Sequence, residues 1–410
     1  MKKLLLARQI DEVVRRAASQ AEGEIALHEP KLCGCELQLV KECLDSGWVS
    51  SVGGFVDRFE QELEALTGAR HAIATVNGTA ALHVCLLLVG VQPGDEVLLP
   101  ALSFVATANA VAYCGAIPHF IDSEERTLGV NPAKLEAYLK EIALMDSYGC
   151  INQQTGRRIR ALIAMHTFGH PVDIEPLIEL CDRHKIELIE DAAESLGSSY
   201  KGASTGTFGK AAALSFNGNK IITTGGGGAI LTSDENLARH AKHLTTTAKK
   251  THRWAFYHDE VGFNYRLPNL NAALGVAQLQ MLPKLFAAKR ALAEYYCKVF
   301  ANITGIRFFE EPAHCTSNYW LNVLLLDTVD IEYRNNLLEN LNNLGILARP
   351  AWDLLNSLPT FNRCPCMDLH VAENLSARII NIPSGPAIGM TLETTHNLNT
   401  TERVSEEVRL

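Results

Sequence analysis

Lys220 is the residue of this 410-residue chain that is best placed to do covalent chemistry. It lies in LSFNGNKIITTGGGGAI, residues 214–230, between an apolar run typical of a strand and four consecutive glycines. A lysine is usually solvated, whereas glycines let a ligand pass close to the backbone without side-chain collisions. An amine at this point is useful only if something binds it.

A carboxylate stands at the end of another apolar run. The segment LIEDAAESLGS, residues 188–198, carries Asp191 and Glu194 out of a predicted buried strand into a predicted helix start. A buried carboxylate is costly unless it is paired or hydrogen-bonded. Asp191 could cap the helix, or it could face a cationic partner such as a protonated ring nitrogen.

A phosphate-binding turn is predicted at VNGTAAL, residues 76–82, where a strand ends and a helix begins. Gly78 allows close approach of the backbone, and Thr79 with the free amide groups could hold a phosphate at the helix N-terminus. An ordinary capped turn is the alternative. Phe104 follows the next strand and could be either a core residue or a flat contact for a ring.

These pieces together fit pyridoxal 5′-phosphate (PLP). This cofactor needs a lysine amine, a carboxylate for its ring nitrogen, a flat contact on its ring and a cup for its phosphate. We expect the first three needs to be met by Lys220, Asp191 and Phe104. The predicted phosphate ligands are Gly78, Thr79 and Ser215.

Composition narrows the classes of partner. The net charge of −9 gives no reason to expect nucleic acid or an acidic membrane as partner. No apolar segment approaches the roughly eighteen residues of a membrane span, and the apolar start of MKKLLLARQIDEVVRR gives way to charges too early for a signal peptide. We therefore expect a cytoplasmic protein whose N-terminus forms a surface helix over residues 4–18.

The eleven cysteines are scattered and odd in number, so they do not resemble a disulfide framework. Two close pairs, Cys33 with Cys35 and Cys364 with Cys366, have one intervening residue where a zinc knuckle has two. We expect reduced cysteines and no metal site.

Short apolar runs alternate with helical patterns from residue 70 onward, which predicts an α/β fold with a mostly parallel sheet and helices on both faces. Ligands bind such sheets at the carboxyl ends of the strands, where loops lead into helices. The expected strands are 71–76, 96–100, 117–122, 160–166, 186–191, 211–216 and 229–232.

The C-terminal part has a different pattern. A long helical pattern over about 267–301 precedes strands and helices that suggest a smaller α+β domain. Within that domain we expect a helix near 331–344, a strand over 378–383 and a final helix near 391–409. The predicted division is a helical extension over 1–24, a large cofactor-binding domain over 25–285 and a small domain over 286–410.

The chain resembles the DegT/DnrJ-type sugar aminotransferases, which have PLP fold type I, the aspartate-aminotransferase-like fold. The resemblance covers roughly residues 25–400 and lies in motifs whose order and spacing agree with the family. The motifs are NGTAAL, PALSFVATANA, HTFGHPVDI, IEDAAESLGSSYKG, GTFGKAAALSFNGNKIITTGGGG and VGFNYRLPNLNAALGVAQL.

The resemblance implies roles at the matching positions. Lys220 would bind the cofactor and move the proton between substrate carbon and cofactor. Asp191 would pair with the ring nitrogen, and Phe104 would lie against the ring. Asn264 of the partner subunit would join the three phosphate ligands, which makes the expected enzyme a homodimer with shared active sites.

Three further positions have less definite roles. Glu194 stands where many relatives carry glutamine or histidine near the ring hydroxyl, and it could also touch substrate. His166, which ends the run RALIAMH, is expected near the substrate, although a core histidine is the alternative. Tyr319 is expected to contact substrate.

The lysine also bears on the reaction, because a histidine replaces it in family members that dehydrate sugars. Lys220 therefore favours transamination. The motifs look most like aminotransferases that install a 4-amino group on a nucleotide-linked 2-acetamido-4-keto-6-deoxyhexose, with glutamate as donor. Such enzymes serve the legionaminic-acid and N-acetylbacillosamine pathways of bacterial surface sugars, including lipopolysaccharide. The carrier nucleotide could be UDP or GDP.

Three alternatives stay open. A 3-keto or other keto nucleotide sugar would be served by the same family. A PLP-dependent lyase or desulfurase would share the fold and Lys220 but would usually need a reactive cysteine, and Cys114 and Cys150 have no obvious activating partner. A PLP-binding regulator would need a DNA-binding element, for which residues 1–30 are too short.

Overall fold

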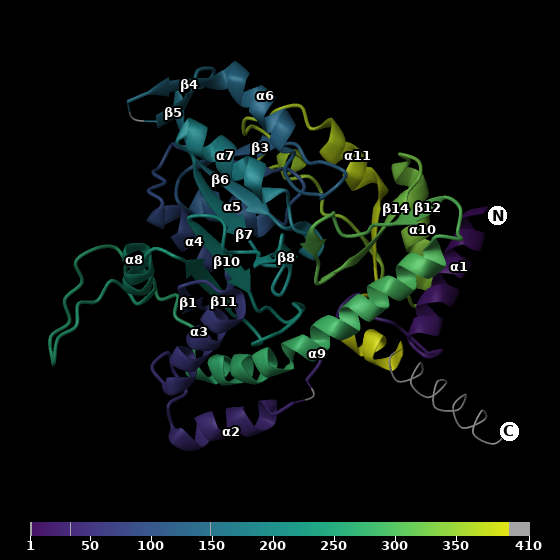
Figure 1. Ribbon diagram of the computed structural model, residues 1–410, viewed down its shortest axis with the longest axis horizontal. Coiled ribbons are helices and arrows are strands. Elements are labelled where there is room, and N and C mark those ends of the chain that lie inside the picture. Colours follow the sequence, from purple (N-terminus) through teal and green to yellow (C-terminus); the bar gives the residue numbers. More distant parts are fainter. Residues whose placement is uncertain (1, 33, 148, 393–410) are drawn as a thin grey trace.

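A computed structural model describes residues 2–32, 34–147 and 149–392 of the chain (Figure 1). Its larger unit is built on a nine-stranded sheet whose main path runs β1-β11-β10-β7-β6-β2-β3. These strands are β1 (His71–Thr75), β2 (Glu96–Pro100), β3 (Ile117–Ile121), β6 (Arg157–Met165), β7 (Glu187–Asp191), β10 (Ala211–Ser215) and β11 (Gly228–Thr232). Strands β10, β7, β6, β2 and β3 are parallel, and β11 lies antiparallel between β1 and β10. The predicted, mostly parallel sheet is confirmed.

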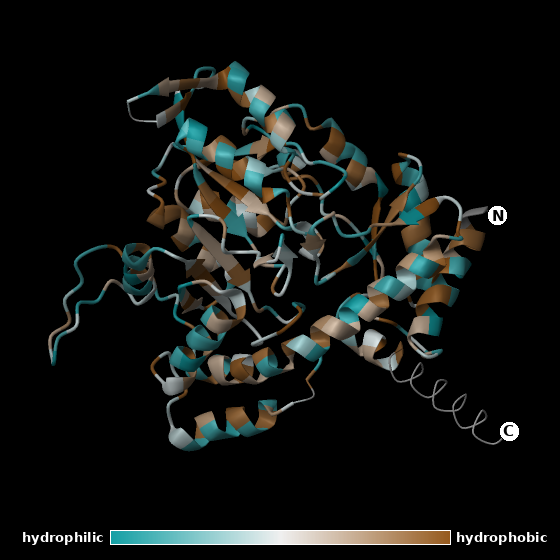
Figure 2. Cartoon of the chain, in the orientation of Figure 1, coloured by the Kyte–Doolittle hydropathy of each residue, from teal (hydrophilic) through white to brown (hydrophobic). Residues whose placement is uncertain are grey.

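Helices cover this sheet because its central strands are apolar and buried along most of their length. Figure 2 shows brown strands lying among helices that carry both brown and teal residues. The helices of this unit are α2 (Glu36–Ser46), α3 (Gly54–Thr67), α4 (Gly78–Leu88), α5 (Val105–Tyr113), α6 (Pro132–Ile142), α7 (Ile174–His184) and α8 (Glu235–Thr245), with the 3-10 turn η1 (Thr167–Gly169). Within the described residues, none of the helices is both long and apolar enough to cross a membrane.

A smaller α+β unit follows, built on an antiparallel sheet in the order β12-β14-β16-β15. Its elements are β12 (Ile306–Phe308), β14 (Asn322–Leu326), α10 (Ile331–Asn343), β15 (Arg349–Pro350), η2 (Leu355–Ser357), α11 (His370–Arg378) and β16 (Ile379–Ile382). Helix α9 (Asn269–Phe300) is 32 residues long and runs from the larger unit to the smaller one (Figure 1). The boundary expected at 285/286 lies inside this helix, and the division at that point stays a prediction.

The N-terminal helix α1 (Lys2–Ala17) packs against the smaller unit. Leu6, Ile10 and Val14 recur at intervals of four residues, so they share one face of the helix. That face is buried in an apolar cluster with residues of α9, α10, β14 and β16. A helix at this position is as predicted, but it is a packed part of the fold.

Some short strands were not predicted. Strands β4 (Ala143–Asp146) and β5 (Gly149–Asn152) form a hairpin beside β6. Strands β8 (Ser199–Tyr200), β9 (Ala203–Ser204) and β13 (Cys315–Thr316) form a small separate sheet. Runs of two to four residues are too short to show an alternating pattern. The helix expected near 391–409 lies almost wholly outside the described residues.

Candidate active site

A cavity of about 890 Å³ lies at the carboxyl ends of β2, β7 and β10, as expected for a ligand site in a parallel sheet. Seven predicted site residues are on its wall, namely Gly78, Thr79, Phe104, Asp191, Glu194, Ser215 and Lys220. The smaller unit adds Trp320, Leu321, Arg349, Trp352 and Asn381, and the N-terminal segment adds Ala26, Leu27 and His28. The cavity is therefore shared between the two units of the chain.

Lys220 extends from the loop after β10 into this cavity. Its side chain is 12% exposed, and its Nζ lies 3.5 Å from Oε1 of Glu194. The same Nζ lies over the indole ring of Trp320, 4.0 Å from the ring centroid. The amine is thus held inside the cavity between a carboxylate and an aromatic face.

Asp191 ends β7 and is buried. Its Oδ2 accepts a hydrogen bond from the hydroxyl of Thr107 at 2.8 Å, and its Oδ1 accepts one from the amide of Ala193 at 3.2 Å. Burial raises the pKa of this carboxyl, against the opposing effects of those two donors and of the charges on Lys220 and His166. The residues after Asp191 form turns, so the predicted helix start is wrong. The alternative in which Asp191 caps that helix is therefore wrong as well.

Glu194 lies beside the amine. Its Oε2 accepts a hydrogen bond from the amide of Phe168 at 2.9 Å. Burial raises its pKa to about 7, an effect that the charge of Lys220 and the Phe168 amide only partly oppose. Glu194 can therefore be neutral or charged near neutral pH.

The turn between β1 and α4 packs tightly against the end of β10. Asn77 caps α4 by accepting a hydrogen bond from the amide of Ala80 at 2.8 Å, which leaves the amides of Gly78 and Thr79 at the open end of the helix. A Cβ at Gly78 would lie 2.9 Å from Cβ and 3.3 Å from Oγ of Ser215. Only glycine allows this approach, and the result is a cup of amides and hydroxyls suited to an anion.

Phe104 lies just before α5 and is 49% exposed, so the core-phenylalanine alternative is wrong. Its ring lies on the cavity wall, with its centroid 6.2 Å from that of Trp352. A flat apolar face is therefore available on the same wall as Lys220.

His166, Tyr319 and Asn264 do not lie on this wall. His166 is fully buried, with Nε2 3.0 Å from Glu190 Oε2 and Nδ1 accepting from an amide, which favours the core-histidine alternative. The hydroxyl of Tyr319 accepts a hydrogen bond from the amide of Glu311, and its ring stacks on another ring away from the cavity. These positions speak against direct contact of His166 or Tyr319 with substrate.

Asn264 is exposed and pairs with Thr246 at the root of the segment between α8 and α9. Figure 1 shows this segment extending away from the body of the chain. Nothing within one subunit brings Asn264 to the cavity, so its predicted role depends on a partner subunit.

The sequence model of the DegT/DnrJ/EryC1/StrS aminotransferase family matches residues 31–399 of the chain. The chain belongs to this family. The GDP-perosamine synthase of Caulobacter vibrioides is 36% identical over 362 residues, covering 88% of this chain and 93% of the synthase. The aminotransferase TlmJ from Streptoalloteichus hindustanus superposes with a TM-score of 0.80 at 28% identity, covering 88% of this chain and 94% of TlmJ. Spr1654 from Streptococcus pneumoniae in its PLP form, 22% identical, shares the fold with a TM-score of 0.79 and coverage of 88% and 93%.

This aminotransferase is PLP-dependent, like its family, and has PLP fold type I. The donor set in its cavity fits the cofactor. An amine, a buried carboxylate, an exposed ring face and a glycine-lined anion cup all lie on one wall. The cavity is also larger than a cofactor of that size needs, which leaves room for a substrate.

Four residues of the aminotransferase site were not predicted from the sequence. Thr107 follows Phe104 by one helical turn, and that spacing could have placed its hydroxyl near the site. Trp320 lies in NYWLNVLLL, which reads as a core strand, and nothing in the sequence signals that it meets Lys220. Arg349 and Asn381 come from short strands of the smaller unit and carry no local motif.

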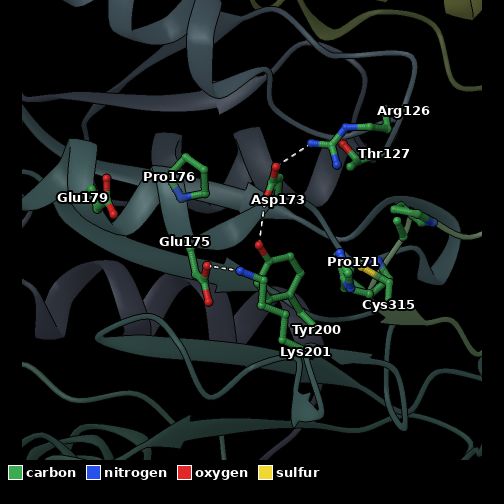
Figure 3. A pocket seen from close by; sticks show the side chains of 13 residues that line it. Arg126, Thr127, Pro171, Asp173, Glu175, Pro176, Glu179, Tyr200, Lys201 and Cys315 are labelled. Atoms are coloured by element: carbon green, nitrogen blue, oxygen red, sulfur yellow. Dashed lines mark hydrogen bonds and ion pairs between the residues drawn. The ribbon is translucent and has the colours of Figure 1, made fainter.

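A second cavity, of about 450 Å³, lies apart from these residues of the aminotransferase (Figure 3). Within it Arg126 pairs with Asp173, which also accepts a hydrogen bond from Tyr200, while Lys201 pairs with Glu175. These four charged groups pair with one another, and none of the predicted site residues lines the cavity. We assign it no role.

The burial of Glu194 should make stability depend on pH. Its pKa in the folded protein lies above that of an exposed glutamate, so protein freed of cofactor should lose stability as the pH rises from about 4.5 to about 7. A glutamine cannot ionise. The difference in unfolding free energy, Glu194→Gln minus wild type, should therefore be larger at pH 8 than at pH 5, by up to about 3 kcal/mol. Urea unfolding at both pH values measures this, and equal differences would contradict the burial of the charge.

Proposed function

We propose that this aminotransferase transfers an amino group from glutamate to C4 of a nucleotide-linked 2-acetamido-4-keto-6-deoxyhexose. The carrier would be UDP or GDP, and the product would serve bacterial surface sugars of the legionaminic-acid or N-acetylbacillosamine type, made in the cytoplasm. The proposal depends chiefly on the Lys220 amine lying inside a cavity of about 890 Å³ whose wall comes from both units. That volume suits a substrate much larger than an amino acid.

PLP supplies an aldehyde that takes up amino groups and a ring that accepts electrons. In the proposed reaction the Nζ of Lys220 binds the cofactor and moves the proton to and from the substrate carbon. Asp191 would hold a proton on the ring nitrogen, since a cation beside this carboxylate offsets the cost of burying its charge. Phe104 would lie against the ring and keep water from that face.

The proposed phosphate site is the cup between α4 and β10. Its ligands would be Gly78, Thr79 and Ser215, which offer two amides at a helix N-terminus and two hydroxyl groups. These neutral donors favour an anion without adding titratable groups. Glu194 lies next to the amine and would contact the cofactor or the substrate there.

A lyase or desulfurase is disfavoured by the state of the two cysteines that it would use. Cys114 and Cys150 are buried, and burial raises their pKa values to about 12 and about 11. A thiol with such a pKa is almost wholly protonated at neutral pH and is a poor nucleophile. Neither lies on the cavity wall.

A second candidate substrate is a GDP-linked 4-keto-6-deoxyhexose with a hydroxyl group at C2. It is favoured by the relative from Caulobacter vibrioides, whose name gives GDP-perosamine, a 4-amino sugar, as its product. The motifs of this chain favour the 2-acetamido group, and the two candidates share the keto position.

A substrate panel distinguishes these candidates. The enzyme is incubated with PLP, glutamate and 4-keto-6-deoxyhexoses linked to UDP or GDP, each with a 2-acetamido or a 2-hydroxyl group. We expect 2-oxoglutarate to form in amounts equal to the 4-amino product, with kcat/KM highest for a 2-acetamido sugar. Higher kcat/KM for a 2-hydroxyl sugar would select the second candidate. Reaction with 3-keto sugars or free amino acids alone would refute both.

We also propose that the active site is shared by two subunits of a twofold dimer, with Asn264 reaching the partner's phosphate cup. The segment that carries Asn264 extends from the body and exposes large apolar side chains, among them Trp254, Phe256 and Val261. Exposed apolar side chains gathered on one segment are typical of an interface. A twofold dimer would form two equivalent sites.

Subunit mixing tests the shared site. Lys220→Ala and Asn264→Ala dimers are each expected to be inactive or severely impaired. If Asn264 acts across the interface, a mixed dimer has one site with both lesions and one with neither, so activity should return on subunit exchange. If it acts within its own chain, every site keeps a lesion. A mixture that stays inactive after verified exchange would refute the shared site.

A further inference from the structure

Trp320 contacts two consecutive residues of the loop that carries the lysine. Its ring centroid lies 4.0 Å from Nζ of Lys220, and its Nε1–H donates to the carbonyl of Asn219 at 2.7 Å. Trp320 is 5% exposed and lies on the cavity wall. Since it belongs to the smaller unit, it holds the lysine loop of the larger unit from across the cavity.

Trp320 is itself fixed from several sides. Its amide donates to Oδ1 of Asn318 at 2.8 Å, and Nδ2 of Asn318 donates to the carbonyls of Glu194 and Leu196. Asn318 therefore ties Trp320 to the segment that bears Glu194, the other contact of the amine. The carbonyl of Trp320 accepts a hydrogen bond at 3.1 Å from Lys289, which is fully buried on α9. These bonds fix the backbone of Trp320, from which the indole extends to the cavity wall.

The two contacts of the Lys220 amine differ in kind. Glu194 is a proton acceptor whose pKa is raised by burial to about 7, so its charge changes near neutral pH. The face of an indole has no titratable group and attracts an ammonium through its electron-rich ring. Only the ring can hold the amine over a wide pH range without competing for its proton.

Confinement matters because a lysine side chain has four rotatable bonds and much conformational freedom. The loop from Phe216 to Gly227 has no regular helix or strand, and the cavity that it borders is large. The indole N–H fixes the backbone one residue before Lys220, while the ring confines the far end of its side chain.

We propose that Trp320 is a positioning residue that keeps the Lys220 amine at the cofactor site whenever the amine is not bonded to the cofactor. The proposal rests on the assignment of Lys220 as the lysine that binds PLP. Loss of the ring should slow bond formation between Lys220 and PLP without weakening the phosphate cup, from which Trp320 is separate.

PLP and pyridoxamine 5′-phosphate (PMP) separate these two effects, because only PLP has an aldehyde that a lysine can bind. Full-length protein freed of cofactor is mixed with PLP, and formation of the bond is followed by stopped-flow absorbance. PMP affinity is measured by calorimetry. For Trp320→Leu we expect bond formation to slow about 10-fold or more while PMP affinity changes less than about 3-fold. Trp320→Phe, which keeps a ring and loses the N–H donor, should fall between.

Tyr319→Leu is a matched control, since it removes a neighbouring ring that is equally buried but lies off the cavity wall. In this variant the rate of bond formation with PLP and the affinity for PMP should both stay within about 3-fold of wild type. An unchanged rate in folded Trp320→Leu overturns the proposal, and so does a parallel loss of PMP affinity, which would indicate general damage. If Trp320→Leu does not fold, the rate of bond formation with PLP and the affinity for PMP are compared in Trp320→Phe and Lys289→Met, and these two variants decide. Borohydride labelling of another lysine would instead refute the assignment of Lys220.

Discussion

Replacing Lys220 by alanine should lower turnover by about 10⁴-fold or more, as expected for a residue that acts directly in the chemistry. No other lysine of the described residues lies on the cavity wall, so no other amine is placed to replace that of Lys220. Phosphate and ring contacts do not depend on the amine. The Lys220→Ala protein should therefore still bind PMP while losing the absorbance of lysine-bound PLP.

The assignment can be checked without turnover. Borohydride reduction of the wild-type enzyme should fix the cofactor onto a peptide that contains Lys220, as read by mass spectrometry. Lys210→Ala is a suitable control, because Lys210 is nearby in sequence but pairs with Asp234 at the surface. That variant should keep normal turnover. A fixed label on any other lysine would contradict the assignment of Lys220 as the lysine that binds PLP.

Asp191→Asn should still bind PLP but lose about 10²-fold or more in turnover. The change keeps the size of the side chain and one acceptor, and it removes the negative charge that holds the proton on the ring nitrogen. Losses of this size are typical when a dominant electrostatic contact in a dry site is removed. Turnover is measured with saturating glutamate and keto sugar, and PLP content by absorbance.

Thr107→Val provides the graded comparison for Asp191. It removes the hydroxyl that donates to Oδ2 and leaves the charge in place. We expect its turnover to fall by about 10-fold, between wild type and Asp191→Asn, since one hydrogen bond to a charged group is lost. Near-normal turnover in Asp191→Asn would show that this carboxylate has a purely structural role.

The strand ends of the larger unit could be predicted because the buried strands are short apolar runs with polar or small residues at, or soon after, their ends. Asp191 and Ser215 end such runs, and Gly78 follows one closely. Parallel strands bring these ends together at one edge of the sheet, so the sequence order was enough to gather the site. The prediction of a helix after Asp191 was wrong. The chain forms turns there despite its local helix propensity, and these turns place Glu194 beside Lys220.

Contacts from the smaller unit could not be predicted in the same way. Tyr319 was expected at the substrate, yet the next residue, Trp320, is the one that faces the cavity. Tyr319 has a positive φ of 45°, so the backbone is not extended there, and no sequence signal tells which of the two neighbouring side chains faces the other unit. His166 likewise directly follows β6, and its partner Glu190 lies on the adjacent strand β7, so it is held in the core.

The packing of α1 has a consequence for the order in which the chain folds. The helix is synthesised well before most of the residues that bury its apolar face, because this cluster, apart from Ile25, runs from Leu292 to Ile388. At ribosomal rates of about 5–20 residues per second, those partners emerge on the order of 15 to 75 s later. Until then the apolar face of α1 is open to chaperones or to other nascent chains. Helix α1 can reach its native place only after the residues from Leu292 to Ile388 have been synthesised.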